Sequence, residues 1–160
     1  LMQCSLLMST VDILKQEDAA GLAEAADIVE SLVSREVGRG IPRSRIVVGG
    51  FSQGGAVALH YGFGCKEPLG GIVGLSTYLP LSGTFPESAV KSAIPTPVFL
   101  AHGLFDPVLV LALGESSRQV LEDNGCDVSW HTYPMPHTVT PEEVRDLSAW
   151  LNSRIWPDDN

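Results

Sequence analysis

The chain has 160 residues, of which 44% are hydrophobic and 18% charged, so it is long enough for one globular domain spanning 1–160 and too apolar for a disordered protein. Its formal net charge is −9, with 10 basic against 19 acidic residues, and no cluster of Lys and Arg interrupts that balance. Nucleic acid is therefore not an expected partner, because binding to phosphates needs a basic surface.

The cysteines and the opening segment indicate a cytoplasmic protein. Cys4, Cys65 and Cys126 are too few and too unevenly spaced for a disulfide framework or a zinc site, and we expect reduced thiols. The opening "LMQCSLLM" lacks the basic flank and cleavage site of a signal peptide, and no apolar run is long enough to span a membrane. Because the chain begins at Leu1, we expect an upstream part.

The predicted elements alternate along the chain. A helix is expected from Asp18 to Val37, where apolar residues recur at helical spacing until "GRGIP" ends it. An apolar strand from Arg45 to Phe51 follows, and a helix begins at once, from Ser52 to about Gly62. The remaining predicted elements are the strands Gly70–Ser76, Thr96–Gly103 and Asp127–Tyr133 and the helices Leu111–Asn124 and Pro141–Ser153. This order predicts an α/β protein with a mainly parallel sheet, in which ligands bind beyond the carboxyl ends of the strands.

The sequence Gly50-Phe51-Ser52-Gln53-Gly54 fits the pattern G-x-S-x-G at the junction of a strand and a helix. A reversal that sharp strains the serine backbone, and glycine at both flanking positions avoids a clash of Cβ atoms. Ser52 would stand at a helix N-terminus, where the Gln53 N–H and the helix dipole could stabilise an oxyanion.

Three other interpretations apply to the same glycines. A dinucleotide-binding fingerprint would need glycine in place of Ser52, and a phosphate-binding P-loop would need a Gly-Lys-Ser/Thr sequence that the chain does not contain. Both fit poorly. A tight strand-to-helix turn without chemistry is the third interpretation, and it stays open at this point.

A nucleophilic serine needs a base, and the base needs a carboxylate to orient it. Hydrolases with this type of turn supply them in the chain order serine, acid, histidine. Asp106 lies in the loop "HGLFDPV" and His137 in the loop "PMPHTVTPEE", each just past the carboxyl end of a predicted strand. Both loops therefore reach the edge of the sheet where Ser52 lies. His60 and His131 are expected to be packing residues, and His102 to brace the loop of Asp106.

The motifs "GGFSQGGAVAL", "LSTYLPL", "HGLFDPV" and "PHTVTPEEV" together resemble the carboxylesterase/phospholipase family of α/β-hydrolases, which includes acyl-protein thioesterases and lysophospholipases. The resemblance runs from about Asp12 to Leu151. It implies an α/β-hydrolase fold and hydrolysis of fatty acyl esters or thioesters, on an acylated protein or a lipid, without metal or cofactor. The roles implied are Ser52 as nucleophile, Asp106 as orienting acid, His137 as general base, Gln53 as oxyanion donor, and Tyr78 and Leu79 in the acyl groove.

The resemblance also implies a strand and a His-Gly loop ahead of Ser52, which supply a second oxyanion N–H in the family. Residues 1–15 contain no such segment. The main alternative is therefore a catalytically weak, hydrolase-like chain that serves as a binding or interaction module. The strand at Ile46–Gly50 would lack a neighbour on one side, which predicts self-association through its edge unless "LMQCSLLM" folds back to cover it.

Overall fold

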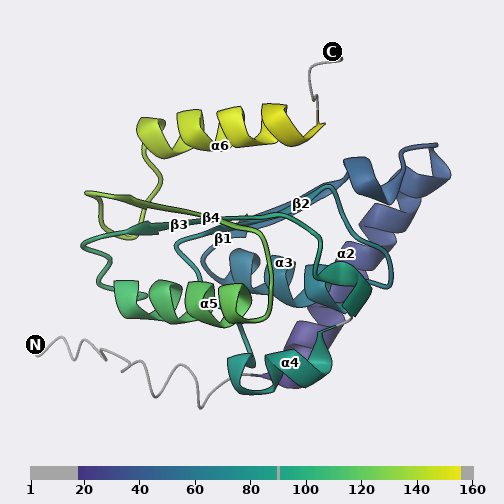
Figure 1. Cartoon of the computed structure of the whole chain (residues 1–160), viewed down its shortest axis with the longest axis horizontal. Helices are drawn as coiled ribbons and strands as arrows, with labels where there is room; N and C mark the ends of the chain where they lie inside the picture. Colours follow the sequence, from purple (N-terminus) through teal and green to yellow (C-terminus); the bar gives the residue numbers. More distant parts are fainter. Residues whose placement is uncertain (1–17, 90, 156–160) are drawn as a thin grey trace, which may run out of the picture.

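The structure is a computed structural model that describes residues 18–89 and 91–155. Four parallel strands form one sheet in the order β1 (Val47–Phe51), β2 (Gly71–Leu75), β3 (Val98–Gly103) and β4 (Val128–Tyr133). Figure 1 shows α6 (Pro141–Ile155) over one face of the sheet and α3 (Gln53–Gly64) and α5 (Leu111–Asp123) under the other. This is the predicted α/β architecture.

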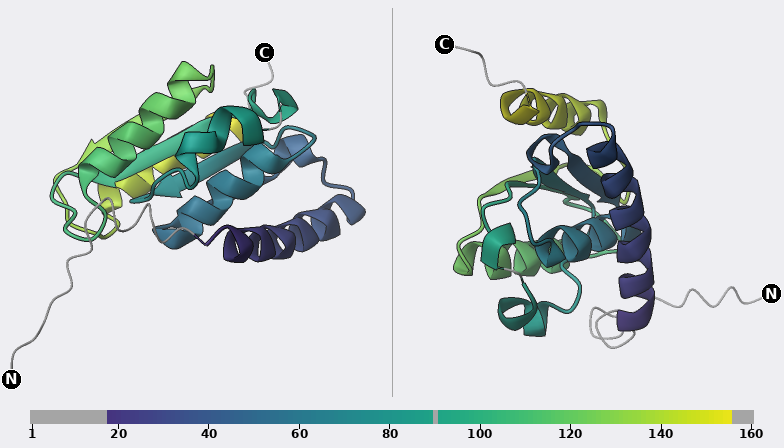
Figure 2. Two further views of the ribbon diagram at one scale, coloured as in Figure 1. Left: turned by 90° about the horizontal axis from the view of Figure 1, so that it is seen from below. Right: turned by 90° about the vertical axis from the view of Figure 1, so that its right-hand side faces the viewer.

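The helix α2 (Ala19–Gly38) packs on α3, and Figure 2 shows it beside α3 along one side of the molecule. It starts at Asp18, whose carboxylate accepts a hydrogen bond from the Gly21 N–H at 3.0 Å and so caps the helix. Just past its end, Gly40 has a φ of 94°, a conformation that favours glycine. The helix thus begins and ends one residue later than the predicted range from Asp18 to Val37.

The core lies on both faces of the sheet, as expected for parallel strands covered by helices. All six residues of β3 are buried, and successive side chains point to opposite faces. Val98 and Leu100 pack toward α3 and α5, whereas Phe99 and Ala101 pack toward α6. Trp150 of α6 completes the second cluster, with its ring centroid 5.7 Å from that of Phe99.

The segment between β2 and β3 contains short helices that the sequence did not predict. They are η2 (Ser82–Thr84), α4 (Phe85–Ser88) and η3 (Lys91–Ala93). Helices of three or four residues are too short to show a hydrophobic period, and the glycine and prolines here indicate a loop instead. The buried ring of Phe85 packs edge-on against Phe63 at 5.0 Å and fixes this segment to α3.

The strand β1 lies at one edge of the sheet, because within the described residues it pairs only with β2. Among the described residues, the strand Ile46–Gly50 thus lacks a neighbour on one side, as expected, whereas "LMQCSLLM" lies outside them. A groove of about 310 Å³ follows this edge. It is lined mainly by apolar residues of α2, α3 and β1: Val29, Leu32, Val33, Glu36, Ile46, Val47, Val48, Gly49, Gly54, Val57 and Ala58.

A polar cluster holds α2 against α3 next to this groove. Arg43 of η1 (Arg43–Arg45) donates hydrogen bonds to both carboxylate oxygens of Glu30 and to the hydroxyl of Tyr61. Tyr61 in turn donates to Glu30 at 2.7 Å. The hydrogen bond from Arg43 is the main reason that the pKa of Glu30 falls to about 2, against a smaller opposing effect of burial.

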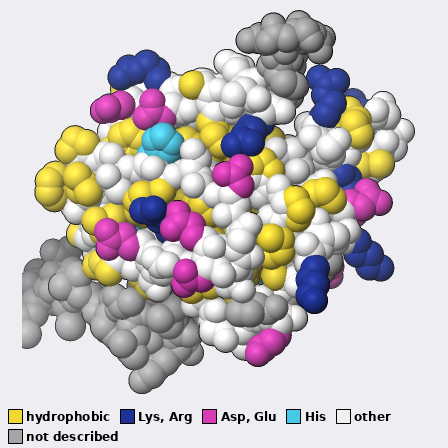
Figure 3. Space-filling model, viewed as in Figure 1, with side chains coloured by type: hydrophobic (Ala, Val, Ile, Leu, Met, Phe, Trp, Pro, Cys, Tyr) yellow, Lys and Arg dark blue, Asp and Glu magenta, His cyan; other side chains and the backbone are white. Residues whose placement is uncertain are grey.

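The basic side chains are dispersed on the surface in Figure 3, and the described cysteines are free thiols. On the face shown in Figure 3, Lys and Arg side chains lie apart from one another, several of them next to Asp or Glu. Cys65 and Cys126 are buried free thiols, and Cys4 lies outside the described residues. Among the helices that the structure describes, none is long and apolar enough to cross a membrane.

Candidate active site

Ser52 lies at the sharp turn between β1 and α3, with φ 54° and ψ −122°. A Cβ atom on Gly50 would lie 2.2 Å from the carbonyl carbon of Gly54, so the prediction that Gly50 must be glycine is confirmed. The prediction for Gly54 is wrong, because a Cβ there would have no described neighbour within 4 Å. The second tight position is Gly55, where a Cβ would lie 2.8 Å from the Gly50 oxygen and from Thr77.

The backbone of Ser52 is held by hydrogen bonds on both sides. Its N–H donates to the Leu75 carbonyl at 2.8 Å, and its own carbonyl accepts from the N–H groups of Gly55 and Ala56. The Thr77 hydroxyl also donates to that carbonyl, at 2.7 Å. Thr77 was not singled out from the sequence, although it belongs to the quoted motif "LSTYLPL". Its contact fixes the strained turn to the chain that follows β2.

The structure brings Ser52, His137 and Asp106 together, although 85 residues separate the first two in sequence. His137 Nε2 lies 3.0 Å from Ser52 Oγ, and His137 Nδ1 lies 2.6 Å from Asp106 Oδ2. The carboxylate can only accept, so Nδ1 carries a proton and Nε2 is free to accept one from Ser52. The Phe51 ring packs against the imidazole at 4.6 Å between centroids.

Asp106 is fixed by the loop after β3. Its side chain is fully buried, and Oδ1 accepts hydrogen bonds from the N–H groups of Val108 and Leu109 at 2.8 and 2.9 Å. The other oxygen, Oδ2, faces His137. The two oxygens thus have separate tasks, since one holds the loop and the other orients the imidazole.

Gln53 is the first residue of α3, and its N–H has no acceptor within the helix. A cavity of about 420 Å³ opens beside it. The lining residues are Asp18, Gly21, Leu22, Ala25, Gln53, Gly54, Ala56, Val57 and Tyr78. Tyr78 thus lines the cavity beside Gln53, and its role in an acyl groove stays a prediction. Leu79 does not share this cavity: it is buried in the core and lines a separate cavity of about 290 Å³ together with Phe63 and Phe85.

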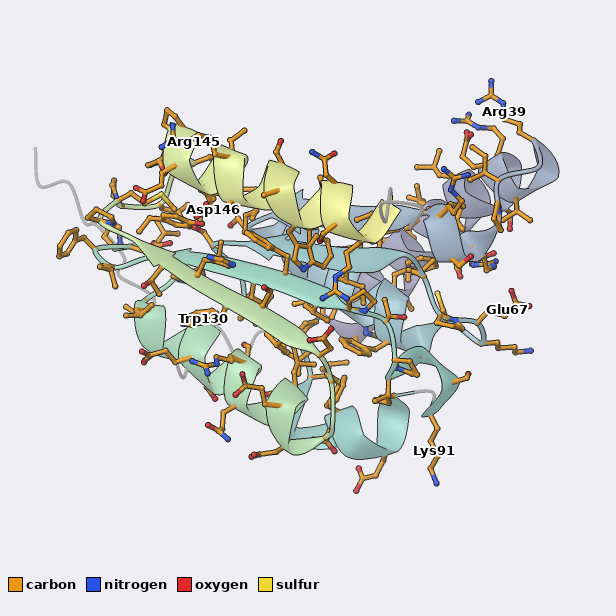
Figure 4. The ribbon with its side chains drawn as sticks, turned by 45° about the horizontal axis from the view of Figure 1, so that its top comes forward. Arg39, Glu67, Lys91, Trp130, Arg145 and Asp146 are labelled. Carbon is orange, nitrogen blue, oxygen red and sulfur yellow. The ribbon has the colours of Figure 1, made fainter. Side chains whose placement is uncertain are left out.

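The other histidines lie among packing contacts. His60 is half-buried in α3, and His131 stacks on Phe99 at 4.8 Å on the side of α6. Asp146, which Figure 4 shows on the side of α6 toward the sheet, lies 3.9 Å from His131 and accepts a hydrogen bond from Tyr133. Within residues 18–89 and 91–155, no group of His, Cys, Asp and Glu side chains has the arrangement of a metal site.

The sequence matches the family described as phospholipase/carboxylesterase over residues 7–155. The chain belongs to this phospholipase/carboxylesterase family. Similar curated proteins include acyl-protein thioesterase 1 of Gibberella zeae, 39% identical over 148 residues, and that of Mycosarcoma maydis, 39% identical over 162 residues. These matches cover 91% and 93% of the present chain. The chain spans 63% of the length of the first relative and 68% of the second.

Solved structures with the same fold include two plant proteins. Acyl-protein thioesterase 2 of Zea mays is 27% identical and superposes with a TM-score of 0.69, covering 85% of this chain and 64% of that protein. SOBER1 of Arabidopsis thaliana is 24% identical with a TM-score of 0.82, covering 86% and 66%. The four strands and their helices therefore correspond to about two thirds of an α/β-hydrolase.

Proposed function

We propose that the chain is a serine hydrolase that cleaves carboxylic esters or thioesters of fatty acyl groups. The observation that carries the proposal is the position of His137, which lies within hydrogen-bonding distance of Ser52 through one ring nitrogen and of buried Asp106 through the other. This is the arrangement in which imidazole activates a hydroxyl. Membership of the phospholipase/carboxylesterase family supports the same reaction class.

In the proposed reaction, His137 Nε2 takes the proton of Ser52 as Oγ attacks the acyl carbonyl carbon. Asp106 stabilises the imidazolium that forms, and the Gln53 N–H donates to the developing oxyanion with the support of the α3 dipole. His137 then returns the proton to the leaving oxygen or sulfur, and water releases the fatty acid from the acyl-enzyme in a second cycle. No metal or cofactor takes part.

The substrate class rests on the cavity beside Gln53. It is lined mainly by small and aliphatic side chains from α2 and α3, together with Tyr78, and so suits an acyl chain better than a charged group. The relatives named acyl-protein thioesterase support an acylated protein as the substrate. The free, buried thiols of Cys65 and Cys126 fit a reducing compartment such as the cytoplasm, and burial raises the pKa of Cys126 to about 11.

Covalent labelling with a fluorophosphonate tests the proposal, because the reagent reacts only with an activated serine. We expect labelling at Ser52, loss of labelling and of p-nitrophenyl ester hydrolysis in Ser52→Ala, and no loss in Ser116→Ala, which changes an exposed serine of α5. A panel of esters of increasing acyl length should show a preference for longer chains. Absence of labelling in the wild type would instead favour the alternative, a hydrolase-like binding module. Labelling that survives in Ser52→Ala would show that Ser52 is not the activated serine.

A further inference from the structure

We propose that His102 is a positioning residue that fixes the carboxylate of Asp106 and, through it, the imidazole of His137. The inference rests on the proposed function, since it concerns the same triad. His102 is on β3 and is 1% exposed, beneath the loop that carries Asp106. The sequence indicated a bracing role for it, and the structure supplies the contact, because His102 Nε2 lies 2.8 Å from the Leu109 carbonyl oxygen.

The contact joins His102 to the triad through one residue. A carbonyl oxygen only accepts, so the Nε2 of His102 carries the proton and donates it to Leu109. The N–H of Leu109 in turn donates to Asp106 Oδ1 at 2.9 Å. Leu109 is thereby held at both ends, and its position decides where the second carboxylate oxygen points. His102 Nε2 also lies 3.7 Å from Asp106 Oδ2, so the imidazole lies close to the carboxylate itself.

The space around the imidazole is built to hold it in one place. A Cβ atom on Gly114 of α5 would lie 2.5 Å from His102 Nδ1 and 2.9 Å from the Trp130 ring. Glycine in a helix interior is destabilising relative to alanine, so its use in α5 is explained by the room that the imidazole needs. Trp130, which Figure 4 shows on the side of β4 toward α5, lies 6.4 Å from His102 between ring centroids.

Loss of the donor would leave the carbonyl of buried Leu109 without this partner, and the loop would shift to find another. The hydrogen bond from His137 Nδ1 to Asp106 is short, at 2.6 Å, and a small rotation of the carboxylate would lengthen it. Because proton transfer depends on that alignment, the expected loss is in turnover and not in substrate binding.

A pair of amide variants separates positioning from packing. The amide nitrogen of His102→Gln can occupy the place of Nε2 and donate to Leu109, whereas that of His102→Asn is too short to reach it. We expect His102→Asn to lower kcat about 10- to 100-fold with KM changed less than about twofold, and His102→Gln to restore most of kcat. Equal losses in both variants, or a loss in KM alone, would overturn the inference.

A spectroscopic measurement tests the same inference without turnover. The proton between His137 and Asp106 should give a far-downfield signal in the NMR spectrum, which Asp106→Asn removes. We expect His102→Asn to shift or broaden this signal and His102→Gln to retain it. Gly114→Ala, which crowds the imidazole, should act like His102→Asn, whereas the control Gly64→Ala places a Cβ in open space near the end of α3 and should have no effect. An unchanged signal in His102→Asn would overturn the inference.

A double-mutant cycle distinguishes this inference from the proposed function. If His102 acts through Asp106, then His102→Asn should cost little further activity once Asp106 is already asparagine. Full additivity of the two losses would contradict the inference and leave the triad intact. Unchanged hydrolysis in Asp106→Asn alone would instead contradict the proposed function, and the NMR signal would still decide the role of His102.

Discussion

The two flanks of Ser52 differ in how completely they are built. On the flank of β2, β3 and β4, the Thr77 hydroxyl donates to the Ser52 carbonyl, His137 faces the Ser52 hydroxyl, and Asp106 is buried behind the imidazole. On the other flank, β1 has no further strand within the described residues, and an apolar groove runs along it. The residues proposed as acid and base thus follow β3 and β4, whereas β1, which precedes Ser52, has no second neighbouring strand within the described residues.

The largest effect is expected on the complete flank. In the proposed mechanism Ser52 and His137 act in one proton transfer, so His137→Ala should lower ester hydrolysis by about 10⁴- to 10⁶-fold, as should Ser52→Ala. The double variant should be little worse than either single one, which initial rates with a short p-nitrophenyl ester would measure. Additive losses would argue against a shared triad, and the surface variant Ser116→Ala provides the control.

A smaller effect is expected on the open flank, where we predict that the chain self-associates through β1. No proline or charge interrupts the strand between Ile46 and Gly50, and these are the devices that keep edges from pairing. Leu32, which lines the groove from α2, is 49% exposed. Leu32→Lys should therefore raise the dissociation constant about tenfold, a change of about 1.4 kcal/mol. Light scattering after size-exclusion chromatography, over a dilution series, would measure it.

The control for this experiment is Val144→Lys on α6, which is similarly exposed, at 50%, and does not line the groove. Val48→Lys is a poorer test, because Val48 is 9% exposed and its loss should reduce association only by weakening the fold. A monomer that persists unchanged across micromolar concentrations would show that the edge does not drive association. In that case the two flanks of Ser52 would differ in structure, but the open flank would not cause self-association.

The smallest effect concerns the cluster that holds α2 beside the groove. Since the pKa of Glu30 is lowered to about 2, chiefly by its hydrogen bond from Arg43, its pairing contributes stability that is present above its ordinary value of 4.5. This contribution is lost as the pH falls toward 2. Glu30 is 42% exposed, so solvent screening limits it to about 1 kcal/mol or less.

Thermal unfolding between pH 2 and pH 7 would measure this contribution. Arg43→Met should lower the stability most above pH 4.5, and the difference from the wild type should narrow in acid. The control Arg39→Met removes an exposed guanidinium that pairs with Glu36 at 3.1 Å, and it should change stability less. A gap between wild type and Arg43→Met that does not vary with pH would assign the effect to packing alone.

The sequence predicts best the features that repeat along the chain. The buried strands and the helix from Ala19 to Gly38 follow from apolar periods and their end signals, and the sheet edge shared by Ser52, Asp106 and His137 follows from parallel strands ending together. These inferences need no knowledge of which residues far apart in the sequence are in contact.

Contacts that depend on one bend or one side-chain direction could not be predicted. Ser76 has a φ of 45°, and the bend there brings Thr77 to the carbonyl of a residue 25 positions earlier. The sequence also could not show that Gly55, and not Gly54, is the glycine at which a Cβ would clash. The direction of a Cβ at the first turn of α3 depends on the exact turn geometry. The 3.0 Å spacing between Ser52 and His137 is likewise a result of folding, and no pattern in the sequence specifies it.

The positive φ of Ser52 sets a conflict between stability and activity at a single position. A side chain with a φ of 54° and a ψ of −122° is strained by about 1–3 kcal/mol, whereas glycine adopts such angles freely. Ser52→Gly should therefore melt at a higher temperature than the wild type, even after the entropic cost of the added glycine, while losing the hydroxyl altogether. If Ser52 is the nucleophile, as proposed, selection for thermal stability alone would favour its loss, and a requirement of the reaction explains why the strained serine is kept.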